Sequence, residues 1–157
     1  MVRFWDTSAL IPLLVQQPAS ARLQDLQRRD AAVAIWWGTP VEIASGLARL
    51  QRHGALARSG LRQAHAALDG LRARATEIEP TDEVRTRAVR LLATHQLRAG
   101  DALQLAAALI WTQERVRGVG FVSMDDRLRG AAAREGFQVL PYAEDVHEVE
   151  LDRDPGL

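Results

Sequence analysis

Four acidic residues, separated by 36, 59 and 24 positions, each stand close to a point where a predicted strand meets a predicted helix. They are Asp6, Glu42, Asp101 and Asp125. If the fold brings these carboxylates into one cleft, their like charges repel strongly there, and a divalent cation makes such a cluster tolerable. Oxygen ligands without cysteine or clustered histidine favour a hard ion, Mg²⁺ or Mn²⁺, over zinc. Such an ion activates water and stabilises charge on a phosphodiester during displacement.

Each of these acids also has a purely structural interpretation. Asp6 and Asp125 are suited to cap helix N-termini, and Asp101 complements the dipole of the helix that it opens. The segment from Thr39 to Glu42 has the letters of a capping box, with proline in the first helical position. Serine or threonine would cap equally well, so the negative charge is the informative feature. The residues alone leave both interpretations open.

Composition limits the classes of protein to consider. The chain has 157 residues, 47% of them hydrophobic and 25% charged, which suits a single globular domain. No apolar run approaches the ~20 residues that a membrane helix needs, and the start does not resemble a secretory leader. We therefore expect no membrane association and a cytoplasmic location. Cysteine is absent, which excludes disulfides, a thiolate nucleophile and cysteine-based zinc sites.

The basic residues are all arginine. The absence of lysine excludes Schiff-base chemistry and the phosphate-binding lysine of a P-loop. It also weakens two other classes with acidic pockets at strand ends, response-regulator receivers and phosphatases of the haloacid dehalogenase type. Net charge is zero, but residues 143–157 carry six acids and one arginine, so this tail is −5 and the remaining 142 residues are +5. A mildly basic body suits a polyanionic partner, although an ordinary surface with a solvated acidic tail explains the same numbers.

Apolar runs alternate with helical spacings along the chain. Strands are predicted at residues 2–5, 32–37, 76–78, 118–122 and 137–140, and helices at 8–15, 19–28, 39–53, 56–75, 81–96, 101–111 and 126–135. Short strands between helices indicate an α/β protein with a mostly parallel sheet covered on both faces. Ligands of such sheets bind outside the carboxyl ends of the strands, where three of the four acids are predicted to lie.

Other side chains give weaker signals. The histidines, at positions 53, 65, 95 and 147, have no metal-ligand spacing and are expected on the surface or on a helix face. Trp36 and Trp37 are adjacent on a predicted strand, so one should pack in the core, while the other lines the cleft mouth or an interface. Arginines at positions 58, 62, 72 and 74 suit a solvated helix face, and we would look for phosphate contacts at Arg58, Arg62 and Arg98.

Four segments resemble the acidic motifs of the PIN domain family. They are VRFWDTSAL at the start, TPVEIASGL around Glu42, LRAGDALQLAAA around Asp101, and FVSMDDRL around Asp125. The resemblance covers residues 2–141 in the family's order and spacing, and it is closest to VapC-type toxins of prokaryotic toxin–antitoxin pairs. The Trp36–Trp37 pair departs from the pattern, because small or aliphatic residues are more usual there.

The resemblance implies a three-layer α/β/α sandwich with a five-stranded, mostly parallel sheet. It implies a nuclease domain at residues 1–142, followed by an acidic C-terminal tail at 143–157. The implied activity is Mg²⁺- or Mn²⁺-dependent endoribonuclease cleavage of RNA, leaving a 5′-phosphate and a 3′-hydroxyl. The implied partners are a second copy of the chain and a cognate antitoxin protein, which packs beside the site and holds the toxin inactive.

The same resemblance assigns roles to residues. The family's acidic quartet matches Asp6, Glu42, Asp101 and Asp125. Asp6 and Asp101 are expected to bind the metal directly, while Glu42 and Asp125 act through water or position the attacking hydroxide. Two supporting residues are Ser123, which matches a Ser or Thr that positions a carboxylate or a water, and Asp126, which starts the following helix.

Three alternatives remain open at this level. One is a non-catalytic PIN-like module that binds RNA or protein, although degenerate modules of this kind tend to lose an acid. A second is another metal-dependent phosphohydrolase, acting on a small phosphate ester or on DNA. The third is a structural α/β domain whose acids only cap helices.

Overall fold

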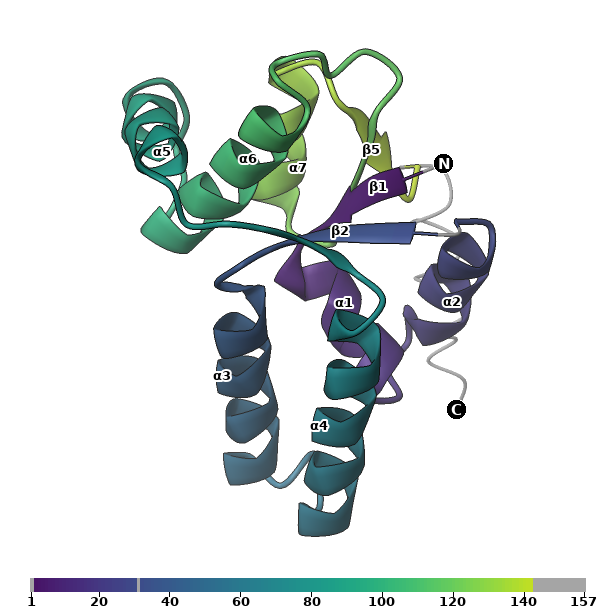
Figure 1. Cartoon of the computed structure of the whole chain (residues 1–157). Coiled ribbons are helices and arrows are strands. Elements are labelled where there is room, and N and C mark those ends of the chain that lie inside the picture. The colour runs from purple at the N-terminus through teal and green to yellow at the C-terminus, as the bar shows by residue number, and fades with distance from the viewer. Residues whose placement is uncertain (1, 31, 143–157) are drawn as a thin grey trace, which may run out of the picture.

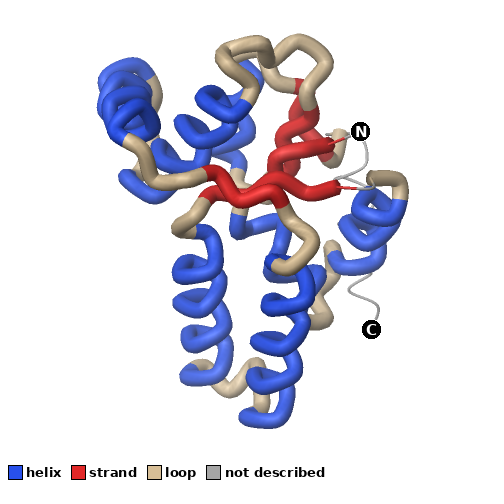
Figure 2. The backbone as a smooth tube through the Cα atoms, in the orientation of Figure 1, coloured by secondary structure: helices blue, strands red, loops and turns tan. Residues whose placement is uncertain are grey.

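Five parallel strands form one sheet at the centre of the computed structural model, which describes residues 2–30 and 32–142 (Figure 2). They are β1 (Val2–Trp5), β2 (Ala32–Trp36), β3 (Thr76–Ile78), β4 (Gly120–Val122) and β5 (Gln138–Leu140), in the spatial order β3-β2-β1-β4-β5. The register pairs Phe4 of β1 with Ala34 of β2 and with Phe121 of β4. The predicted acidic tail lies outside the described residues.

Helices cover both faces of this sheet (Figure 1). On one face lie α1 (Thr7–Leu14), α2 (Ser20–Arg28), α3 (Thr39–Arg52) and α4 (Arg58–Arg72), and on the other α5 (Asp82–Thr94), α6 (Ala99–Trp111) and α7 (Asp126–Arg134). This arrangement confirms the predicted three-layer α/β/α sandwich, with every strand pair parallel.

Side chains of the central strands alternate between two hydrophobic cores, because successive residues of a strand point to opposite faces. Phe4 packs with α5, α6 and α7, whereas the next residue, Trp5, packs with the helices of the other face. Phe4 stacks on Phe121 with ring centroids 5.2 Å apart, and Phe121 contacts Phe137 at 5.4 Å. Burial on both faces explains why these strands appear in the sequence as unbroken apolar runs.

The sheet order defines where the site must lie. The chain winds outward from β1 through β2 to β3 and then returns to the other side of β1 to form β4 and β5. The switch point therefore lies between β1 and β4, and the crevice outside their carboxyl ends is the expected ligand site. At this edge the backbone N–H of Asp6 donates to the carbonyl of Val122 over 3.0 Å, so the two strands stay paired up to the first acid.

All predicted strands and helices are present, and the differences lie at their ends. The helix predicted from residue 101 begins at Ala99, so Asp101 lies within its first turn. The strand predicted from residue 118 begins at Gly120, since Gly118 adopts a φ of 77°. The capping-box interpretation is wrong, because Thr39 is already helical and Gly38 occupies the N-cap without a side-chain hydrogen bond. In the described part of the chain, no helix is long and apolar enough to cross a membrane.

The stacked phenylalanines generate a stability prediction. Phe121→Ala removes a fully buried ring that contacts two others, so we expect it to lower the free energy of unfolding by about 3–5 kcal/mol. Val89→Ala, on the exposed face of α5, should change it by less than about 0.5 kcal/mol. Urea denaturation checks both variants, and equal losses would contradict the packing described here.

Candidate functional site

The four acids that the sequence singled out line one open cavity of about 840 Å³ at the carboxyl edge of the sheet. Asp6 follows β1, Asp125 follows β4, and Glu42 and Asp101 come from the first turns of α3 and α6. The structure thus brings together residues that are up to 119 positions apart in the chain. Asp126 also lines this cavity, on its exposed side.

Asp6 is the most buried of these acids, with 4% of its surface exposed. Its carboxylate accepts hydrogen bonds from the backbone N–H of Ser8 at 3.2 Å and from the Ser8 hydroxyl at 2.8 Å, which caps α1. Burial raises the pKa of Asp6 from the usual 3.8 to about 7, although the hydrogen bonds from Ser8 and Ser123 oppose the rise. Capping and burial in the cavity are therefore properties of the same carboxylate.

Two serines connect Asp6 to the end of β4. The Ser8 hydroxyl accepts from the backbone N–H of Met124 at 2.8 Å and lies 3.4 Å from the hydroxyl of Ser123. The buried Ser123 hydroxyl in turn accepts from the backbone N–H of Asp125 at 3.1 Å. The Asp125 carboxylate caps α7 by accepting from the backbone N–H of Leu128 at 2.9 Å. This chain of contacts fixes the two strand-end acids relative to each other.

Glu42 is held by neutral donors. Its Oε2 accepts from the Thr7 hydroxyl at 3.0 Å and from the side-chain amide of Gln104 at 3.3 Å. Burial raises the pKa of Glu42; these two hydrogen bonds lower it, and the negative charge of Asp101 adds to the rise. The sequence interpretation missed Thr7 and Gln104, although a glutamine within an otherwise apolar helix was a visible signal.

Both acidic and basic neighbours affect the pKa of Asp101. Burial raises its pKa, and the nearby negative charge of Asp125 raises it further. The backbone N–H and the guanidinium of Arg98, together with the guanidinium of Arg127, oppose this rise. Asp101 thus interacts electrostatically with each of the other three acids, Asp6, Glu42 and Asp125.

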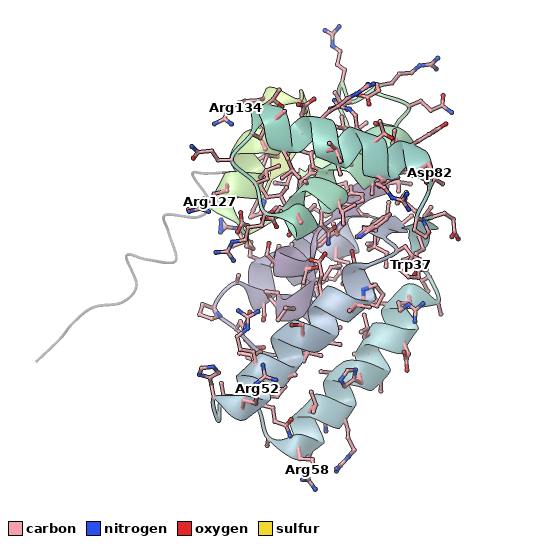
Figure 3. The ribbon with its side chains drawn as sticks, turned by 90° about the vertical axis from the view of Figure 1, so that its left-hand side faces the viewer. Trp37, Arg52, Arg58, Asp82, Arg127 and Arg134 are labelled. Atoms are coloured by element: carbon pink, nitrogen blue, oxygen red, sulfur yellow. The ribbon has the colours of Figure 1, made fainter. Side chains whose placement is uncertain are left out.

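Arginines from three elements line the same cavity. They are Arg49 of α3, Arg98 at the start of α6, and Arg127 of α7. Among the described residues, none of the four acids forms an ion pair with an arginine or a histidine. Arg58 and Arg62 lie on α4 outside the cavity lining, and Figure 3 shows Arg58 at the far end of the molecule from Arg127.

The donor set suits a hard divalent cation in chemical type and in number, since it consists of four carboxylates without cysteine or histidine. The two residues expected from the sequence to bind the ion directly, Asp6 and Asp101, both line the cavity. Within residues 2–30 and 32–142, however, no three Asp, Glu or His side chains stand as a ready-made group for a metal. The carboxylates would therefore have to draw together around an ion.

The predictions for the histidines are confirmed at two positions and wrong at a third. His53 and His65 are exposed as expected, and His147 lies outside the described residues. The prediction for His95 is wrong: its side chain is buried, with Nε2 2.7 Å from a carboxylate oxygen of Glu135, because the C-cap residues of α5 and α7 lie side by side.

Of the tryptophan pair, Trp36 is buried in the core, as expected for one of the two. Trp37 is 50% exposed. Trp37 is absent from the cavity lining.

Comparison with protein families gives one match. The sequence matches the family model described as PIN domain over residues 3–134, which is most of the chain. No curated protein matched the sequence.

Solved structures with the same fold include proteins from bacteria and an archaeon. A toxin–antitoxin complex from Klebsiella pneumoniae matches with 19% identity over 82% of this chain and 91% of that chain, at a TM-score of 0.58. VapC20 from Mycobacterium tuberculosis, a toxin that cleaves the sarcin–ricin loop, matches with 20% identity. The match covers 88% of this chain and 97% of that chain, at a TM-score of 0.61. A protein from Pyrobaculum aerophilum matches with 18% identity over 98% of this chain and 100% of that chain, at a TM-score of 0.63. At these identities the likeness shows the fold.

The raised pKa of Asp6 predicts how stability depends on pH. Between about pH 4 and pH 7 the folded state keeps a proton on Asp6 that the unfolded state releases, so the stability of the metal-free protein falls as pH rises through this window. Asp6→Asn keeps a capping side chain and removes this loss. At pH 8 the free energy of unfolding of the variant should exceed that of the wild type by a few kcal/mol, since a pKa shift of one unit corresponds to about 1.4 kcal/mol.

Urea denaturation in EDTA across this pH range measures the effect. Asp69→Asn, on the exposed side of α4, is the matched control and should follow the wild type. Identical pH profiles for the wild type and Asp6→Asn would contradict the burial of a charged Asp6.

Proposed function

This chain belongs to the PIN domain family, and on that basis we propose that it is a Mg²⁺- or Mn²⁺-dependent endoribonuclease, the toxin of a toxin–antitoxin pair. The observation that carries the proposal is the cavity in which four carboxylates from four separate elements meet without an ion-pair partner among the described residues. Burying so much negative charge is unfavourable for a purely structural domain.

In this mechanism Asp6 and Asp101 hold the metal ion. When bound, the ion supplies Lewis-acid stabilisation of a phosphodiester oxygen and an activated water. Ser8 fixes the orientation of the Asp6 carboxylate through two hydrogen bonds, so the other carboxylates would move toward it to share the ion. Glu42 and Asp125 would orient the attacking water, and Glu42, whose pKa is raised by burial, would accept its proton. The products would carry a 5′-phosphate and a 3′-hydroxyl.

The arginines account for the choice of a polyanionic substrate. Arg49, Arg98 and Arg127 line the cavity around the acids, so a phosphate backbone that lies across it meets guanidinium groups on several sides. Phosphates beside the cleaved bond would be held by these side chains, which leaves the acids for the metal. Arg58 and Arg62, on α4, do not line this cavity.

The proposed protein partners are an antitoxin and a second copy of this chain. The similarity in fold to the toxin–antitoxin complex from Klebsiella pneumoniae supports the first of these. The exposed Val41, which lines the cavity, and the half-exposed Trp37 offer apolar surface that suits a protein partner.

Cleavage of RNA by the purified, partner-free protein tests the activity. We expect discrete fragments with Mg²⁺ or Mn²⁺, none with excess EDTA, and at least about a 100-fold loss of rate in Asp101→Asn, since a metal ligand is removed. Asp69→Asn should cleave at the wild-type rate. A folded, metal-loaded wild type without activity would overturn the proposal and favour a binding module, and full activity in Asp101→Asn would overturn the assigned site.

Binding of RNA in EDTA tests the arginines separately from cleavage. Arg98→Gln should weaken binding and reduce the slope of log affinity against log salt by about 1, as expected for one lost phosphate contact. Arg58→Gln is the matched control outside the cavity and should leave both quantities close to those of the wild type. Equal effects of the two substitutions would mean that RNA binds along α4 as well.

A further inference from the structure

Gln104 is an anomaly in α6. Its neighbours Ala102, Leu105 and Ala106 are fully buried, and Gln104 itself is only 1% exposed. Burying a side-chain amide is unfavourable unless its donors and acceptor are satisfied, and an apolar side chain of similar size would avoid that cost. The contacts of this amide should therefore explain its presence.

The amide of Gln104 reaches three side chains on two other helices. Its Nε2, which carries two hydrogens, lies within donating distance of three oxygens: the Thr39 hydroxyl at 3.0 Å, the Thr7 hydroxyl at 3.1 Å and Oε2 of Glu42 at 3.3 Å. Its Oε1 lies 3.3 Å from the same Thr39 hydroxyl, which holds the plane of the amide. Gln104 thus links α6 to α1 and α3 at the acidic cavity.

These contacts engage only one of the two Glu42 oxygens. Oε2 is shared by Gln104 and Thr7, whereas Oε1 has no hydrogen-bond partner among the described residues and faces the start of α6 near Gly100. A neutral amide holds the carboxylate in place but leaves its negative charge, whereas an arginine would neutralise that charge. Glu42 therefore presents a fixed and uncompensated oxygen toward the neighbourhood of Asp101.

We propose that Gln104 is a positioning residue for the reaction, which holds Glu42 so that its free oxygen can receive the attacking water. Gln104 does not line the cavity, while Glu42 and Thr7 do, so it acts through them and does not touch RNA. This inference rests on the nuclease function proposed above and assigns that site a buried partner of Glu42.

A double-mutant cycle tests this role. Gln104→Met retains the bulk and burial of the side chain but removes the amide; it should lower kcat by about 10- to 100-fold, as loss of a supporting hydrogen bond does, with KM for RNA nearly unchanged. In a Glu42→Gln background the same substitution should change the residual rate by less than about 2-fold, because the group that it positions is already gone. A purely structural role would instead give the same fold-loss in both backgrounds.

Ser20→Ala is the matched control, since Ser20 is 1% exposed and hydrogen-bonded but lies outside the cavity lining. It should lower the urea midpoint while leaving kcat unchanged, which separates loss of stability from loss of positioning. Wild-type kcat in folded Gln104→Met, or equal losses in the two backgrounds, would overturn the role of Gln104 while leaving the nuclease proposal intact. A wild type that cleaves no RNA would overturn the nuclease function itself.

Discussion

The unfavourable burial of the Asp6 carboxylate is the constraint around which the rest of the site is arranged. A strand in the middle of a parallel sheet ends at the switch point, and the residue that follows it is withdrawn from water by helices on both faces. A carboxylate in that position is tolerated because Ser8 donates two hydrogen bonds to it and because α1 begins there. The remaining acids add repulsion, which the protein only partly relieves.

Neutral groups close to the acids and cationic side chains farther away reduce the repulsion between the carboxylates. Hydroxyls, backbone N–H groups and one amide contact the carboxylates directly, while Arg49, Arg98 and Arg127 line the same cavity without forming ion pairs to them. Direct ion pairs would satisfy the acids and leave nothing for a metal. In the proposed nuclease, this separation leaves the carboxylates for the metal and the guanidinium groups for the phosphate backbone.

Helix capping and chemistry are not competing explanations in this fold. Asp6 and Asp125 both cap the helices that follow their strands, and both line the cavity. In a parallel sheet the strand end and the following helix N-terminus occupy the same crevice, so a residue there meets both demands. For Glu42 the capping interpretation failed, because proline and glycine already begin α3 and the side chain is free to turn toward Thr7 and Gln104.

Apolar periodicity and helix N-terminal residues are local signals, and they were enough to predict the strands, the helices and the four acidic positions. The mostly parallel sheet followed from the order of these elements, whereas the PIN-like fold was implied by the resemblance of the four acidic segments to that family. Which arginines accompany the acids depends on how the helices pack: Arg49 of α3 and Arg127 of α7 line the cavity, whereas Arg58 and Arg62 of α4 do not. The same holds for Gln104, whose three partners lie 62, 65 and 97 positions away in the chain. Contacts at such separations arise from how the layers pack, and no local pattern encodes them.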